Sequence, residues 1–157
     1  MKKLDLSDDL AYRLFVLLRQ AGHVIYKSSE KELQKNGISV VEHAVLFITQ
    51  SIGPKATPAE ISRWMVRERN SISALLTRME KKGLIKLTKD LDRKNMLRVS
   101  LTKKGKQVYR ISAKMETIHS ILSTFPKEVI IQLIASLRDL RDRAMEEIGL
   151  EYKPPFP

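Results

Sequence analysis

The chain has 157 residues, no cysteine and a formal net charge of +11. This length suits a single domain with a buried core. The lack of cysteine excludes disulfides and thiolate metal sites, and it agrees with a reducing compartment, so a cytoplasmic protein is expected. No apolar run approaches the roughly 20 residues of a membrane span, and residues 1–9 lack the pattern of a secretory signal. We therefore expect no membrane partner.

The positive charge is confined to the middle of the chain. Residues 55–110 contain sixteen Lys and Arg against five Asp and Glu, whereas the other 101 residues contain thirteen of each sign. A local excess of this kind indicates a polyanionic partner, and we expect double-stranded DNA. The alternative is a basic surface that only meets solvent, but random scatter would not leave both flanks balanced.

Hydrophobic periodicity predicts two helices before the basic region. Ser7 precedes two acids and is expected to cap a long first helix that ends near Gln34, with its apolar residues in one stripe. Ser39 and Glu42 have the spacing of a capping box, which begins a second helix. The Gly-Pro pair at 53–54 should end that helix.

A helix-turn-helix is predicted next. Thr57 as cap, Pro58 at the first helical position and Glu60 three residues after the cap predict a short helix over 58–65. A tight turn then leads into a helix over 70–83. Apolar residues at three- and four-residue steps give this helix one core face, and its other sides are small and polar. Small side chains allow a helix to lie deep in a major groove about 12 Å wide.

Two short strands should follow, at 84–89 and 96–101, because apolar and polar residues alternate in both. They flank a polar hairpin tip at 90–95. A helix-turn-helix followed by a basic hairpin is a winged helix. The predicted fold class is therefore mainly α with a small β-hairpin wing, in which long helices serve for dimerisation.

The rest of the chain is predicted to be helical. Thr102 should cap one continuous helix that reaches Leu122, since apolar residues recur along it at three- and four-residue steps. A last helix should end at Gly149, and residues 154–157 should be unstructured. We expect Trp64 to be a core anchor rather than an aromatic at a ligand or DNA face.

Three segments, in this order, resemble the MarR (multiple antibiotic resistance regulator) family of winged-helix transcription regulators. They are Arg78-Met-Glu-Lys-Lys-Gly-Leu-Ile85, Asp92-Arg-Lys94 and Val99-Ser-Leu-Thr-Lys-Lys-Gly105. The resemblance extends over nearly the whole chain. It implies a homodimer on a pseudo-palindromic operator, often with repression that a small molecule relieves.

The resemblance also implies how the chain is divided. A single domain of this type would span 1–157, with the DNA-binding winged helix at 40–101 and dimerisation helices at 1–36 and 102–149. An effector pocket would lie between the winged helix and the dimerisation helices. Filling of the core or the interface is the stronger interpretation for each pocket candidate. The candidates are Arg19, Tyr26, His43, Phe47 and Met65.

The expected DNA contacts lie in the second helix of the helix-turn-helix and at the hairpin tip. Ala74 stands where many family members have Arg, so a bidentate guanine contact from that position is lost, and Arg67 or Arg69 is the candidate to replace it. Arg93 at the tip suits a narrow minor groove, with Asp92 beside it to hold the side chain. The set expected to contact DNA is Arg67, Arg69, Asn70, Ser71, Ser73, Ala74, Thr77, Arg78, Asp92, Arg93 and Lys94.

Weaker expectations surround this set. Ser71 and Ser73 could cap the helix rather than contact DNA. For any single basic neighbour, a solvated surface role is about as probable as a phosphate contact, so the argument rests on the set. These candidate phosphate neighbours are Lys81, Lys82, Lys86, Arg98, Lys103, Lys104 and Lys106.

Catalysis, cofactors and metals are not expected. No Ser-His-Asp order, glycine-rich phosphate loop or cofactor motif is present, and His23, His43 and His119 are scattered over three predicted helices. The second functional hypothesis is a dimer that coats nucleic acid without sequence choice. Competition between a promoter fragment and bulk DNA would separate this hypothesis from a sequence-specific regulator.

Overall fold

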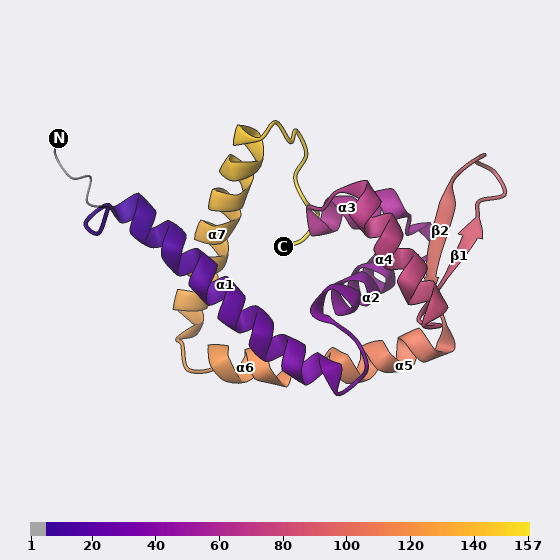
Figure 1. Ribbon diagram of the computed structural model, residues 1–157, viewed down its shortest axis with the longest axis horizontal. Helices are drawn as coiled ribbons and strands as arrows, with labels where there is room; N and C mark the ends of the chain where they lie inside the picture. Colours follow the sequence, from indigo (N-terminus) through magenta and orange to yellow (C-terminus); the bar gives the residue numbers. More distant parts are fainter. Residues whose placement is uncertain (1–5) are drawn as a thin grey trace.

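The computed structural model describes residues 6–157, which form seven α-helices, one 3-10 helix and a two-stranded antiparallel sheet. Residues 1–5 lie outside the described residues. They include part of the segment that was considered as a secretory signal and part of the expected dimerisation region. Figure 1 shows two parts: a body made of the hairpin with α2 (Val40–Ile52), α3 (Pro58–Met65) and α4 (Arg69–Lys81), and arms made of α1 (Leu10–Gln34) and α7 (Lys127–Glu147). The mainly helical fold class with a hairpin wing is confirmed.

The first arm is α1, Leu10–Gln34. Its end agrees with the prediction, but its cap does not. Asp9 is the N-cap, and its carboxylate accepts a hydrogen bond of 2.8 Å from the backbone N–H of Tyr12. The prediction of Ser7 as the cap was wrong because the acid two residues later reaches the free N–H groups of the first turn and also meets the positive end of the helix dipole.

The helix α2, Val40–Ile52, begins with the predicted capping box. The Ser39 hydroxyl accepts from the backbone N–H of Glu42 at 3.2 Å, and the Glu42 carboxylate accepts from the backbone N–H of Ser39 at 2.9 Å. The same carboxylate lies 2.7 Å from Nζ of Lys82, just after the end of α4. A short 3-10 helix, Gly53–Lys55, follows.

The core of the body is formed where α2 meets α3, Pro58–Met65, and α4, Arg69–Lys81. The predicted cap Thr57 and the predicted bounds of α3 are both confirmed, and so is the core face of α4. Full burial of each such side chain contributes about 1.5–3 kcal/mol. The completely enclosed side chains include Leu46, Ile61, Ile72, Leu76 and Met79.

The wing is the hairpin of β1, Ile85–Lys89, and β2, Leu97–Leu101. Its register pairs Ile85 with Leu101 and Leu87 with Val99. The backbone N–H of Val99 also donates to the carbonyl of Ala56 at 2.9 Å, so β2 is attached to the segment that leads into α3. This attachment gives the two strands the support that an isolated hairpin lacks.

The helix α5, Lys103–Ser112, packs tightly under the wing. Thr102 caps it as predicted, accepting from the backbone N–H of Gly105 at 2.9 Å, and its hydroxyl donates to the carbonyl of Gly83 at 2.6 Å. A methyl group at position 105 would collide with the carbonyl of Leu84. Glycine is therefore required for this close approach between α5 and the start of β1.

The continuous helix predicted from Thr102 to Leu122 was wrong. The chain breaks at Met115, whose φ is +44°, and resumes as α6, Glu116–Leu122. The carboxylate of Glu32, from α1, accepts hydrogen bonds of 2.8 Å from the backbone N–H groups of Glu116 and Thr117. An acid far away in the sequence thus satisfies the N–H groups that a new helix start leaves free.

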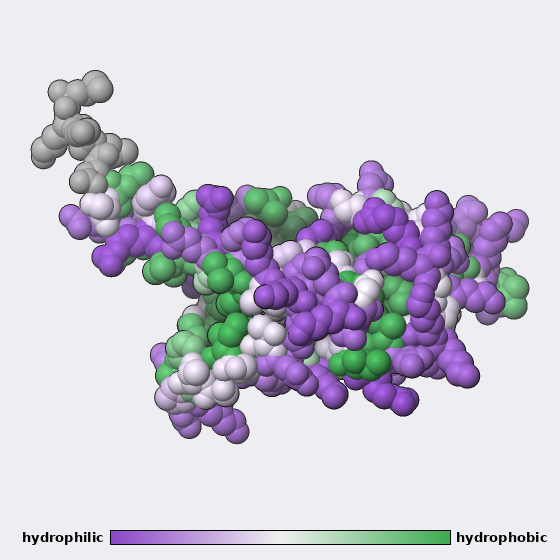
Figure 2. Space-filling model, turned by 60° about the horizontal axis from the view of Figure 1, so that its bottom comes forward, coloured by the Kyte–Doolittle hydropathy of each residue, from purple (hydrophilic) through white to green (hydrophobic). Residues whose placement is uncertain are grey.

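The second arm is α7, Lys127–Glu147. It packs extensively on no other element within residues 6–157. The predicted apolar stripes on both arms are largely uncovered: Leu17 of α1 is 60% exposed and Leu137 of α7 is 47% exposed. Figure 2 shows apolar side chains gathered over this end of the molecule.

The last residues have no regular secondary structure, as predicted, but they are not detached. Pro154 is buried, and the ring of Phe156 lies 5.1 Å from the ring of Phe47, centroid to centroid. Among the described residues, no single helix has the length and apolar character to cross a membrane. Only the bent combination of 103–122 with 127–147 meets those two criteria.

Candidate nucleic-acid interface

The turn between α3 and α4 sets the direction of the helix expected to enter the groove. Val66 adopts a left-handed conformation with φ +51°, and the Ser62 hydroxyl donates to the carbonyl of Arg67 at 2.5 Å. The N-cap of α4 is Glu68, which makes no side-chain capping bond to the helix. Ser71 and Ser73 lie within α4 and neither is its N-cap. The first turn of α4 thus has no side-chain cap, and Arg67 and Arg69 beside it are exposed, an arrangement that can accept an anion.

The side of α4 away from the core carries the predicted contact residues. The core face holds Ile72, Leu75, Leu76 and Met79, so the remaining positions point to solvent. One of them is already engaged, because the Thr77 hydroxyl donates to the carbonyl of Ser73 at 3.0 Å. The exposed residues of this face are Arg69, Asn70, Ser71, Ser73, Ala74, Thr77 and Arg78.

A groove joins α4 to the wing. It has a volume of about 350 Å³ and brings Arg69 and Ser73 of α4 together with Lys94 of the hairpin tip. Thr57 and Pro58 at the start of α3 close its side. Residues from both parts of the predicted DNA-contact region, α4 and the hairpin tip, therefore share one concave, basic surface.

The acid that organises the wing is Asp90, which the sequence analysis did not single out. Its carboxylate accepts from the backbone N–H of Asp92 at 2.8 Å and lies 2.6 Å from the guanidinium of Arg98. These hydrogen bonds, that from Asp92 foremost, lower the pKa of Asp90 below its ordinary value. Arg98 also donates to the carbonyl of Lys55 at 2.9 Å. Arg98 therefore ties the start of the hairpin loop to the segment before α3, whereas Arg93 is exposed at the tip.

The basic neighbours fall into two groups. Nζ of Lys82 pairs with Glu42, and Nζ of Lys104 donates to the carbonyl of Lys82 at 2.8 Å. These two side chains, with Arg98, hold the body together in addition to carrying charge. The other basic neighbours are exposed at the surface: Lys81, Lys86, Lys103 and Lys106.

The candidate pocket residues lie in two places. Arg19 and Tyr26 are exposed on α1, and the Arg19 guanidinium carbon lies 5.8 Å from the ring centroid of Phe15. Phe47 and Met65 lie at the edge of the core. The pocket that would join these two places stays a prediction.

The fifth candidate, His43, is a residue of α2 whose side chain faces α5. Its Nδ1 is 3.0 Å from the hydroxyl of Ser112, and its ring is 6.0 Å from that of Tyr109. Burial lowers the pKa of His43, with an opposing effect of the Glu32 charge. Within residues 6–157, no three His, Cys, Asp or Glu side chains are placed to hold a metal ion.

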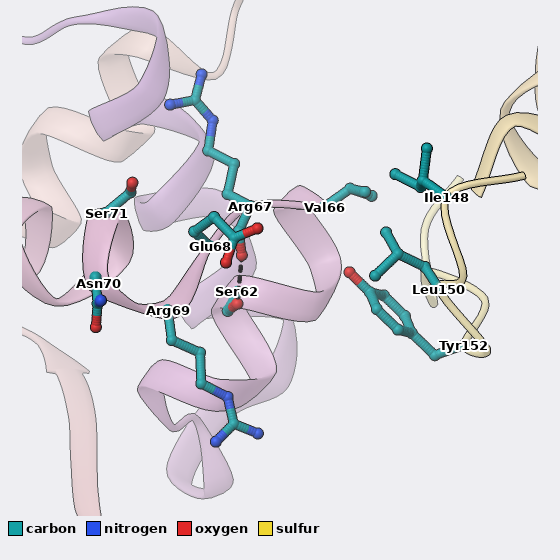
Figure 3. Close-up of a pocket in the computed structure, with 10 residues that line it drawn as sticks. All are labelled: Ser62, Val66, Arg67, Glu68, Arg69, Asn70, Ser71, Ile148, Leu150 and Tyr152. Atoms are coloured by element: carbon teal, nitrogen blue, oxygen red, sulfur yellow. Dashed lines mark hydrogen bonds between the residues drawn. The ribbon is translucent and has the colours of Figure 1, made fainter. Parts of the chain in front are cut away.

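A second hollow lies beside the start of α4. It has a volume of about 630 Å³, and Figure 3 shows its two walls: the α3–α4 turn on one side, and Ile148, Leu150 and Tyr152 on the other. Sequence reasoning missed this site. The only indication was a pair of apolar residues, Leu150 and Tyr152, after the glycine that ends the last helix.

Comparison with known proteins gives a consistent result. The sequence model of the winged helix DNA-binding domain family matches residues 39–105. BadR, a transcriptional activatory protein of Rhodopseudomonas palustris, is 26% identical over 113 residues. These residues are 70% of this chain and 64% of BadR, so the match spans less than two thirds of that relative.

Two solved structures share the fold. The organohalide-sensing transcriptional regulator RdhR, bound to 2,4-dichlorophenol, has a TM-score of 0.86 and 26% identity over 100% of this chain and 95% of its own. A mutant MarR from E. coli in complex with operator DNA has a TM-score of 0.73 and 16% identity over 85% of this chain and 99% of its own. At 16% identity the likeness concerns the fold alone. The homologues and the fold are those of transcription regulators, which are not enzymes.

Proposed function

This chain is a transcription regulator of the winged-helix, MarR type, and from that premise we propose that it acts as a homodimer on a pseudo-palindromic DNA operator. The observation that carries the proposal is the combination of two surfaces in one chain. The body presents a concave basic face, and the arms present apolar stripes that residues 6–157 leave largely uncovered. The first surface suits a polyanion, and the second suits another copy of the chain.

The dimer follows from the arms. An apolar face of this length would be costly to leave in water, and proteins that expose one generally use it for association. A two-fold symmetric dimer would cover each stripe with the same stripe of its partner. The balanced charge of the flanking segments favours such close contact, because two strongly basic arms would repel each other.

The mode of DNA binding follows from the body. Each α4 would enter a major groove with Asn70, Ser71 and Ser73 toward the bases, and two copies would occupy successive grooves about 34 Å apart. Arg93 at each wing tip would enter the flanking minor groove. The exposed lysines and the open start of α4 would contact phosphates, which fix the position of the protein without selecting sequence.

We further propose repression, relieved by a small organic molecule. A dimer that occupies a promoter blocks it by its presence alone, so repression requires no additional surface. The relative BadR is named an activator, so the direction of control is a separate question from operator binding. The fold neighbour RdhR is bound to 2,4-dichlorophenol, which supports an aromatic effector as the first candidate to test.

A competition experiment tests the central proposal. A duplex that the protein selects from a random pool is labelled and challenged with bulk DNA at fixed salt, with a gel shift as the measurement. A sequence-specific regulator should prefer the selected duplex by about 10³-fold or more. Equal competition by bulk DNA would instead support the dimer that coats nucleic acid without sequence choice. A reporter placed behind the selected duplex then gives the direction of control.

A further inference from the structure

The segment after α7 returns to the body and docks there with an aromatic ring. The Phe156 ring is nearly parallel to that of Trp64, with 17° between the planes and 6.2 Å between centroids. On its other side it lies 5.1 Å from the ring of Phe47. Pro154, two residues earlier, is buried. A segment without regular secondary structure is thus held by an aromatic site that α2 and α3 form together.

The same segment is also attached to the arm from which it comes. A guanidinium nitrogen of Arg141 in α7 donates to the carbonyl of Pro157 at 3.4 Å, and another lies 2.8 Å from the carboxylate of Asp142. Nζ of Lys153 lies 4.0 Å from that carboxylate. The segment therefore has one set of contacts on α7 and another on the body.

Between these two attachments the segment passes the turn that leads into α4. Leu150 and Tyr152 form one wall of the hollow of about 630 Å³ whose other wall includes Val66, Arg67 and Arg69 (Figure 3). The hollow separates the middle of the segment from the turn. The segment therefore contacts the body firmly only at its C-terminal end. Since α7 packs extensively on no other described element, this segment is a principal connection between that arm and the DNA-contacting body.

We propose that residues 150–157 are a strap that fixes the helix-turn-helix relative to α7, so that the position of the arm in the dimer sets the position of α4. This inference rests on the proposed function, because it assigns a regulatory role to the spacing of two DNA-contacting helices. The Phe156 ring remains 52% exposed, so its docking can be reversed without opening the core of the body. With the strap released, the two copies of α4 lose their fixed separation.

The docking can be measured without DNA because Trp64 is the only tryptophan in the chain. In Phe156→Ala, the emission of Trp64 should shift to longer wavelength and acrylamide should quench it more strongly, since the stacked ring is gone. Phe125→Ala is the matched control, because Phe125 is 47% exposed and lies in the connection before α7. Unchanged emission and quenching in Phe156→Ala would refute the docking. A chain shortened to end at Lys153 lacks the whole docked end, so in that case its emission should also equal that of the wild type.

The coupling is measured with duplexes that differ by one base pair in the separation of the half-sites. The wild-type protein should prefer one separation, and Phe156→Ala should lose at least about fivefold of that preference, a typical size for coupling between sites. If Phe156→Ala shifts the emission of Trp64 but keeps the full preference for one half-site separation, the coupling is refuted. If the wild-type protein selects no duplex at all, the proposed function fails and the coupling fails with it, whereas the Trp64 measurement still decides whether the strap docks.

Discussion

The body and the arms of this molecule are built from similar helices but differ in how they are stabilised. In the body, α2, α3, α4 and the wing enclose a common core, and Ile72 and Leu76 have almost no exposed surface. In the arms, the apolar residues of α1 and α7 recur with the same helical spacing, yet Leu14 is 50% exposed and Leu133 is 46% exposed. The comparison teaches that hydrophobic periodicity identifies a helix face that must be buried. It does not indicate whether that face is buried by the same chain or by a second one.

The largest expected effect comes from a cavity in the body. Ile72→Ala should lower the free energy of unfolding by about 2–5 kcal/mol, because the deleted atoms leave a space that the packed core cannot close. Urea denaturation followed by circular dichroism measures the change. The loss should be the same at low and high protein concentration, since this core lies within one chain. If the loss of stability disappears at high protein concentration, the core of the body also depends on association, and the distinction between body and arms is wrong.

A similar truncation in an arm should act on association instead. Leu17→Ala should weaken dimerisation by about 1.5–3 kcal/mol per buried copy, which is the value of a leucine side chain transferred from water. Analytical ultracentrifugation over a dilution series gives the dissociation constant.

The control must be a residue of α1 without a structural contact. Glu30→Ala at the far end of α1 is not suitable, because the Glu30 carboxylate accepts from the backbone N–H of Val40. Gln20→Ala, at an exposed polar position of α1, serves instead. An unchanged dissociation constant in Leu17→Ala would remove α1 from the interface.

A smaller effect is expected at the wing tip. Arg93→Ala should weaken binding to the selected duplex and reduce the slope of log affinity against log salt by about 0.9, as expected when one positive charge no longer displaces a counterion from the DNA. Arg93→Lys is the matched control: it should restore the slope, but not the full affinity if the guanidinium lies in a narrow minor groove. If Arg93→Ala has the salt slope and affinity of the wild type, the tip does not contact DNA.

The smallest expected effect concerns pH and His43. Its pKa is lowered by burial, so the unfolded chain binds a proton more readily than the folded chain. The corresponding stability is fully present above the unfolded pKa and is lost as the pH falls from there through the folded pKa. We expect thermal stability to fall between pH 7.5 and pH 5.5, and this part of the slope to vanish in His43→Gln. His23→Gln, on the exposed surface of α1, should keep the slope.

Local features were predicted from the sequence because their causes lie within a few residues. The capping box of Ser39 and Glu42 and the bounds of α3 depend on contacts three residues apart, and both are confirmed. The core face of α4 depends on the helical period alone. The break at Met115 was missed because the group that stabilises the new helix start is Glu32, which lies 84 positions from its nearer partner.

The candidate site shows the same division. The sequence placed a helix and a basic hairpin side by side, and the groove that joins Arg69 to Lys94 follows from that order. It did not reveal that Asp90 organises the tip, because Asp90 and Asp92 are the same residue type and only the backbone path selects one of them. The docking of Phe156 was invisible for a different reason: a proline-rich end has no period to follow, and its partners are fixed by three-dimensional shape.

The glycine at position 105 leaves no room for even one more carbon between α5 and the start of β1, the strand that follows α4. Two elements in such contact have no hinge between them. In the proposed dimer, a rotation of α5 would therefore be passed on to the hairpin as a rigid-body movement. A structural change that reaches α5 would thus be transmitted to the wing as a rigid-body rotation, without local unfolding.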